Sequence, residues 1–172
     1  MNIYLLRHGI AVSAEETAPD GERPLTAKGI KRMRKAARGL RRLGLDFDAI
    51  LTSPLVRARQ TADIVAVALG LESQLTVLET LQPNCAVEEL LTSLSDYQDC
   101  KHLLLVGHEP LLSGTAAFLV TGKKTVALEI ALKKGGLCHI EIDSLPPRNP
   151  GTLRALLAPK QLRFLGTRGA KS

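Results

Sequence analysis

The sequence predicts a three-layer α/β/α fold, in which a mainly parallel central sheet is flanked by helices on both faces. Short apolar runs alternate with longer amphipathic segments along the chain, and glycine or proline separates most of them. Three of the apolar runs end directly on polar or charged residues. The chain has 172 residues, of which 45% are hydrophobic, enough for one packed core. We therefore expect residues 1–172 to form a single domain.

The N-terminal quarter predicts a strand, a long loop and a helix. Residues 2–6 form an apolar run suited to a buried strand. Residues 10–25 are polar and contain two prolines, which predicts a loop, and loops of this length in compact domains are often functional. Thr26 is an N-cap candidate for a helix that extends to about Leu43, and Gly44 is its stop signal.

The next quarter repeats this alternation. Residues 49–52 predict a second strand. Ser53 is an N-cap candidate, and Pro54 suits the first position of a helix that reaches about Leu69 before Gly70. Residues 75–78 predict a third strand, and residues 86–94 a short helix.

The second half begins with a buried strand at residues 102–106, followed by a helix at residues 111–120. Residues 137–142 and 153–157 predict two more strands, separated by a proline-rich loop at residues 146–151. The chain contains no internal repeat and no low-complexity segment.

The formal net charge of +6 favours anionic partners. Much of the excess lies in the segment 28–42, where basic residues alternate with apolar ones at helical spacing. This face is either solvated or a docking surface for an acidic protein or another polyanion. Nucleic acid is not the predicted partner, because the segment has no readout motif and aromatic residues make up only 3% of the chain. The basic residues are Lys28, Lys31, Arg32, Arg34, Lys35, Arg38, Arg41 and Arg42.

The three cysteines, Cys85, Cys100 and Cys138, have neither an even number nor metal-ligand spacing, so we predict free thiols and no metal site. Met1 leads directly into a strand, and no apolar run is long enough to span a bilayer. We therefore expect a cytoplasmic protein without a membrane partner, as a monomer or a weak oligomer.

Functional side chains are predicted at three strand ends. Arg7 and His8 follow the first strand, Arg57 follows the second, and His108 follows the strand at residues 102–106. The carboxyl ends of parallel strands meet at one edge of a sheet, where ligands bind in open α/β folds. Two arginines and two histidines gathered there favour a phosphate site, because phosphoryl transfer depends mainly on positioning and electrostatic stabilisation.

Each of these residues also has a structural interpretation. His8 is either a histidine satisfied by backbone contacts or a nucleophile whose other ring nitrogen donates to a carbonyl. Arg57 lies in the first turn of a helix, where a cation is unfavourable; it either extends into water or shares an anion with the helix N-terminus. His108 is either a loop histidine or a donor to phosphoryl oxygens. His102 and His139 lie inside strands and are predicted to be structural, and Arg59 is predicted to be solvated.

The chain resembles the histidine phosphatase superfamily, and most closely its short SixA-type phosphohistidine phosphatases. By this resemblance the fold is phosphoglycerate mutase-like, His8 is the phosphorylated nucleophile, and Arg7, Arg57 and His108 complete the phosphate pocket, with no metal or other cofactor. The matching stretches cover the first two thirds of the chain: Leu6-Arg7-His8-Gly9, Arg23-Pro24-Leu25-Thr26-Ala27-Lys28-Gly29, Ser53-Pro54-Leu55-Val56-Arg57-Ala58-Arg59-Gln60-Thr61-Ala62 and Val106-Gly107-His108.

The resemblance leaves two residues open. Many members carry a carboxylic acid after the third strand that protonates the leaving group; here Glu79 is the candidate, and Glu88 and Glu89 are alternatives. Arg23 either contacts substrate or forms a structural salt bridge.

The resemblance also implies a substrate class. Relatives that act on phosphosugars carry a larger insertion after the third strand, whereas residues 78–101 leave room for one short helix, so an open site is expected. The predicted function is a metal-independent phosphatase that removes phosphate from phosphohistidine on a signalling or phosphotransfer protein. The alternatives are a phosphatase of small phosphate esters and a non-catalytic phosphate-binding module.

Overall fold

The computed structural model describes residues 1–13, 19–123 and 128–167, and within these ranges the chain forms one six-stranded sheet. The strand order is β3-β2-β4-β1-β5-β6. Neighbours among the first four strands of this order are parallel, whereas β5 is antiparallel to both β1 and β6. The strands are β1 (Asn2–Arg7), β2 (Ala49–Thr52), β3 (Leu75–Val77), β4 (His102–Gly107), β5 (Leu137–Glu141) and β6 (Thr152–Leu157).

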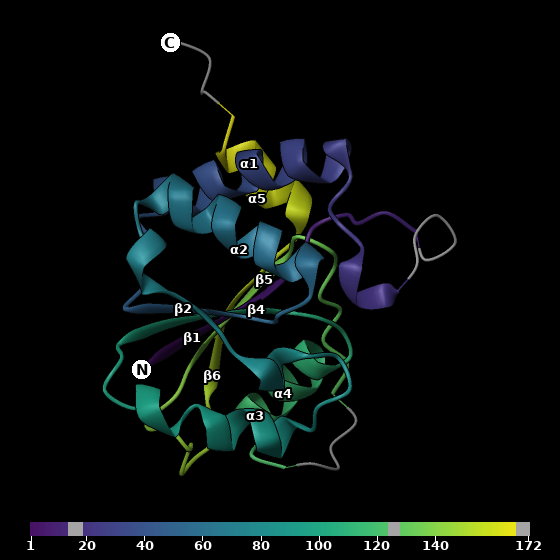
Figure 1. Ribbon diagram of the computed structural model, residues 1–172. Coiled ribbons are helices and arrows are strands. Elements are labelled where there is room, and N and C mark those ends of the chain that lie inside the picture. Colours follow the sequence, from purple (N-terminus) through teal and green to yellow (C-terminus); the bar gives the residue numbers. More distant parts are fainter. Residues whose placement is uncertain (14–18, 124–127, 168–172) are drawn as a thin grey trace.

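Helices cover both faces of this sheet, as Figure 1 shows. One face carries α1 (Ala27–Arg42), α2 (Val56–Leu69) and α5 (Pro159–Leu165), and the other carries α3 (Val87–Ser93) and α4 (Leu111–Thr121). Short 3₁₀ turns connect several elements: η1 (Asp20–Glu22), η2 (Glu72–Gln74), η3 (Glu79–Leu81) and η4 (Ser95–Tyr97). The predicted three-layer α/β/α class, with a mainly parallel sheet, is confirmed.

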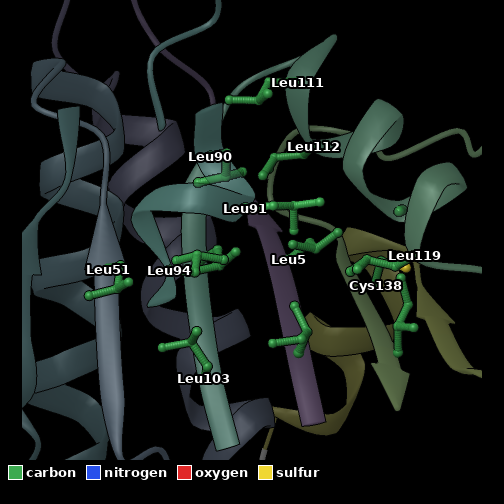
Figure 2. Packing of buried hydrophobic residues seen from close by; sticks show 14 of the residues in the cluster. Leu5, Leu51, Leu90, Leu91, Leu94, Leu103, Leu111, Leu112, Leu119 and Cys138 are labelled. Atoms are coloured by element: carbon green, nitrogen blue, oxygen red, sulfur yellow. The ribbon is translucent and has the colours of Figure 1, made fainter. Parts of the chain in front are cut away.

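The strands alternate between two apolar cores because successive side chains of a strand point to opposite faces. In β1, Leu5 belongs to the core on the α3 and α4 side, whereas Leu6 belongs to the core under α1 and α2. Figure 2 shows Leu90 of α3 and Leu94 just after it, together with Leu5 and leucines of neighbouring strands, in the first of these cores. Both faces of the central strands are therefore buried, which fixes the strand ends that carry the candidate site.

Helix α1 is anchored at both ends. The Thr26 hydroxyl accepts a hydrogen bond from Gly29 N–H at 2.9 Å, so Thr26 is the N-cap as predicted. A Cβ at Gly29 would lie only 2.1 Å from the carbonyl oxygen of Ile10, so the loop after β1 can approach the helix only because residue 29 is glycine. This close approach holds the first turn of α1 beside the β1 exit.

The predicted start of α2 was wrong. The helix begins at Val56, two residues later than expected, and Leu55 rather than Ser53 is its N-cap. The Ser53 hydroxyl instead accepts from Leu55 N–H at 3.3 Å and lies 2.9 Å from His108 Nε2. Ser53 therefore belongs to the candidate site and not to the helix cap.

One helix of the C-terminal third was not predicted. Helix α5 was missed, and it packs against α1, where two basic residues of the segment 28–42 bond to its C-terminal end. Arg42 donates to the carbonyl of Leu165 at 2.6 Å, and Arg38 donates to that of Gly166 at 3.3 Å. Both arginines stay exposed, as do Lys28, Lys31, Arg34 and Arg41, so the solvated interpretation holds for these six; Arg32 and Lys35 are half-buried.

Candidate active site

The end of β1 places Arg7 and His8 at the centre of the sheet edge. His8 N–H donates to the carbonyl of Gly107 at the end of β4, at 3.1 Å, so the exits of β1 and β4 are held side by side. Gly135 N–H donates to the carbonyls of Arg7 and His8 at 2.9 and 3.0 Å, so the backbone after β1 is also bonded to the segment that precedes β5. The backbone around His8 is thus fixed from both neighbouring strands.

The protonation of His8 is determined by its hydrogen bond. His8 Nδ1 lies 2.7 Å from the carbonyl oxygen of Gly9, and a carbonyl can only accept, so Nδ1 carries the proton. In the neutral ring Nε2 then holds a lone pair. Gly9 N–H in turn donates to the Thr61 hydroxyl of α2 at 3.0 Å, which orients the peptide that orients the ring. His8 therefore presents a nucleophilic nitrogen in a fixed tautomer.

Burial keeps this nitrogen free of protons. Only 6% of His8 is exposed. Burial lowers its pKa from 6.5 to about 4; the bond to Gly9 opposes this shift, and the positive charges of Arg57, Arg7 and Lys134 add to it. At neutral pH the ring is uncharged and available to attack an electrophile.

His108 faces His8 from the end of β4. The two ring centroids are 5.0 Å apart, and the ring planes are inclined by 50°. His108 is 2% exposed, and its pKa is lowered to about 3, mainly by burial and also by His8, Arg57 and Arg7, whereas Asp20 opposes the shift. Its Nε2 lies 2.9 Å from the Ser53 hydroxyl, whereas its Nδ1 is buried and has no hydrogen-bond partner among the described residues.

Arg57 is held by the loop after β1. Its guanidinium donates to the backbone carbonyl of Asp20 at 2.6 Å and to the Asp20 carboxylate at 2.9 Å. Arg57 is 4% exposed, whereas the Asp20 side chain is 56% exposed. The two guanidinium bonds to Asp20 fix the plane of Arg57 and leave its buried Nε without a partner in the described part of the chain.

Arg7 lies where the site opens to the surface. One of its NH groups donates to the carbonyl of Leu132 at 2.9 Å, and its Nε is buried without a partner within the described ranges. Arg7 also lines a hollow of about 810 Å³ that extends between α3, α4 and the segment 128–133. Arg7 is the residue of the four that connects the buried histidines to this hollow. The other residues that line it are Val87, Glu88, Glu109, Pro110, Ser113, Gly114, Ala117, Phe118, Lys123, Leu128, Glu129, Ile130, Ala131, Leu132 and Lys133.

The structure brings together the four residues that the sequence predicted as the phosphate pocket. Arg7, His8, Arg57 and His108 come from three neighbouring strand ends, and two cations face two uncharged imidazoles. Buried polar nitrogens are usually paired, so the unpartnered Nε atoms of Arg7 and Arg57 and Nδ1 of His108 are exceptional. Such nitrogens around the unprotonated Nε2 of His8 suit an oxyanion.

The remaining sequence candidates differ in how they lie relative to these four. The Glu79 carboxylate is exposed, accepts from Gln82 at 2.8 Å and does not line the hollow. Glu88 does line it, whereas the Glu89 carboxylate accepts from the backbone N–H of Ala86 at the start of α3. Arg23 pairs with Asp20 and donates to the carbonyl of Val12 at 3.0 Å, as its salt-bridge alternative required.

Glu109 was missed by the sequence reasoning. It follows His108 directly and lines the same hollow as Arg7. The Ser113 hydroxyl donates to its Oε2, whereas its Oε1 is buried without a partner in the described residues. The available signal was an acidic residue beside a functional histidine at a helix start, where a carboxylate is favourable.

The other predicted structural residues have ordinary partners. His102 Nδ1 lies 3.3 Å from the Tyr4 hydroxyl, and His139 Nε2 lies 2.8 Å from the side-chain oxygen of Asn2. Arg59 pairs with Asp63 at 3.1 Å on the surface of α2. Among the described residues, no three His, Cys, Asp or Glu side chains come together as a metal site. No helix in these ranges is both long and apolar enough to cross a membrane.

Comparison with known proteins connects this geometry to a family. Residues 3–82 match the model of the histidine phosphatase superfamily (branch 1). An uncharacterized protein of Picosynechococcus sp. is 43% identical over 94% of this chain and 99% of its own length. The phosphohistidine phosphatase SixA of Escherichia coli K12 is 33% identical over 72% of this chain and 76% of its own length.

A solved structure extends the match to the whole fold. The structure of the protein histidine phosphatase SixA complexed with tungstate has a TM-score of 0.82, with 27% identity over 94% of this chain and 99% of that one. The family model, the sequence relatives and the solved structure thus agree on the family. The chain belongs to branch 1 of the histidine phosphatase superfamily.

Proposed function

We propose that this phosphatase removes the phosphoryl group from phosphohistidine on a signalling or phosphotransfer protein, through a phosphorylated His8 and without a metal ion. The observation that carries the proposal is the lone pair of His8 Nε2, held in a fixed tautomer beside Arg7 and Arg57. A binding module needs the two cations but has no need of a nucleophile. The named activity of the SixA relatives supports this substrate class.

The reaction would proceed in two displacements. His8 Nε2 attacks phosphorus in line, the P–N bond of the substrate breaks, and the departing imidazole takes up a proton. Water then attacks the phosphorylated His8, which releases inorganic phosphate and restores the free ring. Covalent catalysis divides one difficult step into two easier ones.

Arg7, Arg57 and His108 would hold the phosphoryl oxygens during both steps. Each has a buried nitrogen without a partner in the described part of the chain, so an oxyanion would satisfy groups that are already in place. Tungstate is a tetrahedral oxyanion, and its presence in the SixA structure supports an oxyanion pocket of this kind. Asp20 would keep the Arg57 guanidinium oriented without occupying its Nε.

The shape of the approach supports a phosphate carried on a protein. The hollow beside Arg7 holds about 810 Å³ and opens to the surface between α3 and α4. Segment 78–101 contributes only the short helix α3 and two 3₁₀ turns, so it builds no separate wall. A phosphohistidine side chain could reach His8 while the rest of its protein stays outside.

Glu109 is the proposed source of the leaving-group proton, in place of Glu79. Glu109 lines the hollow and directly follows His108 in the chain, whereas Glu79 is exposed and bonded to Gln82. We expect Glu109→Gln to lower kcat for a phosphate ester at least about tenfold, because an ester oxygen needs a general acid. Glu79→Gln is the matched control and should leave kcat unchanged. If only Glu79→Gln loses activity, Glu79 and not Glu109 is the general acid.

The function is tested by phosphate release from a phosphohistidine protein and from a small phosphate ester, with a chelator present. The wild-type chain should release phosphate from the protein much faster than from the ester, and His8→Ala should release it from neither. Acid-labile label on His8 after rapid quenching should mark the intermediate. Turnover of the ester alone would favour the small-ester phosphatase. Phosphoprotein binding that survives His8→Ala, without any turnover, would favour the binding module.

A further inference from the structure

A second hollow lies on the other side of the loop that follows His8. It has a volume of about 380 Å³, within the range of small-molecule sites. All five charged residues that line it are cations, and no acidic residue contributes to its wall. Its lining is Gly9, Ile10, Gly29, Arg32, Met33, Ala36, Lys133, Lys134, Gly135, Ala158, Pro159, Lys160 and Arg163. We call it the cationic hollow.

The two arginines of the cationic hollow are not neutralised within the described residues. Arg32 of α1 and Arg163 of α5 are both half-buried, and neither forms an ion pair there. The pKa of Arg163 is lowered by burial and by the positive charge of Arg32. Two like charges brought together at a helix interface cost stability unless an anion offsets them.

Packing alone does not account for this pair. Arg38 and Arg42, further along α1, also face α5, but both donate to backbone carbonyls at its end. They therefore act as ordinary packing contacts between the two helices. Arg32 and Arg163 make no such hydrogen bond in the described part of the chain and line a hollow instead.

The cationic hollow adjoins the catalytic machinery. Gly9, whose carbonyl fixes the His8 tautomer, forms part of its wall. Lys133 lines both this hollow and the larger one beside Arg7. The charge of Lys134 acts on His8. An anion bound here would therefore lie close to the phosphate pocket without occupying it.

We propose that the cationic hollow is a second anion site that binds a compact oligophosphate, with Arg32 and Arg163 as its principal ligands and Lys160, Lys133 and Lys134 at its rim. Guanidinium groups bind phosphate oxygens through paired N–H donors, and several cations favour a ligand with several negative charges over a single phosphate. The volume admits a short phosphate chain. This site is independent of the substrate proposed above.

The test is calorimetric titration of inorganic tripolyphosphate into three proteins, each with His8→Ala so that no turnover occurs. The first has no further change, the second adds Arg32→Gln and Arg163→Gln, and the third adds Lys31→Gln and Arg34→Gln. The third set removes the same charge from exposed residues of α1 that do not line the cationic hollow. Thermal unfolding checks that all three proteins are folded.

We expect the second protein to bind tripolyphosphate at least about tenfold more weakly than the first, with the third unchanged, because only the second loses charge-assisted hydrogen bonds to the ligand. Inorganic phosphate should bind this site weakly. If ATP binds with the same pattern across the three proteins, the site is assigned to nucleotides. If tripolyphosphate binds and ATP does not, the site is assigned to inorganic oligophosphate. Equal affinity in all three proteins, or equal weakening in the second and third, would overturn the proposal.

Discussion

The exits of β1 and β4 each carry a buried histidine, but the two rings are held in different ways. His8 is bonded to a backbone carbonyl, which can only accept, so one tautomer is imposed. His108 is bonded to the Ser53 hydroxyl, which can donate or accept, so either of its nitrogens can carry the proton. The β1 exit is therefore suited to a nucleophile, because its histidine has a lone pair on one fixed nitrogen. The β4 exit is suited to a hydrogen-bonding partner of the phosphoryl group, because its histidine can change tautomer.

Removing each imidazole in turn is the strongest test of this difference. His8→Ala should lower kcat at least about a thousandfold, because no nucleophile remains. His108→Ala should lower it about a hundredfold, the usual effect of losing one group that stabilises transition-state charge. Rapid quenching should trap phosphoenzyme in the His108 variant only. Phosphoenzyme in the His8 variant would contradict the comparison.

The pH dependence of stability tests the property that the two rings share. Both pKa values lie below the 6.5 of an exposed imidazole, at about 4 for His8 and about 3 for His108. Between about pH 6.5 and pH 3 the two histidines bind more protons in the unfolded chain than in the folded one. The free energy of unfolding therefore falls as pH drops from about 6.5 towards 3. At about 1.4 kcal/mol per pKa unit, we expect the two rings together to account for a loss of up to about 8 kcal/mol.

Denaturant unfolding at several pH values measures this loss. Carboxylates such as Asp20 and Asp48, whose pKa values are lowered in the folded chain, also contribute to acid destabilisation. The difference between wild type and the double variant His8→Asn/His108→Gln isolates the histidines. If the free energy of unfolding of the double variant changes with pH as steeply as that of wild type, the two histidines have the same pKa values in the folded and the unfolded chain.

Thr61→Val should loosen the β1 exit alone. The Thr61 hydroxyl accepts from Gly9 N–H and donates to the Arg57 carbonyl at 2.7 Å, so its loss leaves the buried Gly9 N–H unpaired, whereas the Arg57 carbonyl keeps its bond within α2. We expect a stability loss of about 1 to 3 kcal/mol and a fall in kcat of about tenfold. Thr115→Val is the matched control, because Thr115 bonds within α4. Thr115→Val should lower the free energy of unfolding without the same fall in kcat. An equal fall in kcat in both variants would show that the effect of Thr61→Val is a general loss of stability.

Ser53→Ala should loosen the β4 exit and have the smallest effect. It removes the hydroxyl bonded to His108 Nε2, but the ring stays packed between its neighbours. We expect kcat to fall a few-fold, about 1 kcal/mol in barrier height, with little change in KM. The pH profile of kcat should shift as well, which a merely structural role would not produce. Ser93→Ala, in α3, serves as the control.

The sequence predicted the part of the molecule that depends on local pattern. Strands β1, β2 and β4 and the caps of α1 follow from apolar runs and from Thr26 and Gly44, so the three strand ends were placed correctly. The start of α2 failed because Ser53 prefers a tertiary partner, His108, to the local cap. Helix α5 was missed because it is short, with Leu162 buried but Phe164 exposed by 78%.

The site was predictable to the same extent. Arg7, His8, Arg57 and His108 each follow a strand, and parallel topology is enough to bring them together. The contact between Asp20 and Arg57 depends on how the loop after β1 returns over α2, which no local pattern encodes. The position of Glu109 in the hollow likewise depends on how α4 packs beside the segment 128–133.

The place of β4 in the sheet has a consequence for folding. It is the last of the four parallel strands in the sequence, yet it lies between β2 and β1, which do not pair with each other. The strands that precede His8 and Arg57, β1 and β2, therefore do not belong to one hydrogen-bonded sheet until β4 has been made and has inserted between them. Closing a sheet through its centre requires contacts between distant residues, which are slow to form. Oxyanion binding should thus report completed folding: a nascent chain that stops before residue 102 would lack both the closed sheet and the pocket.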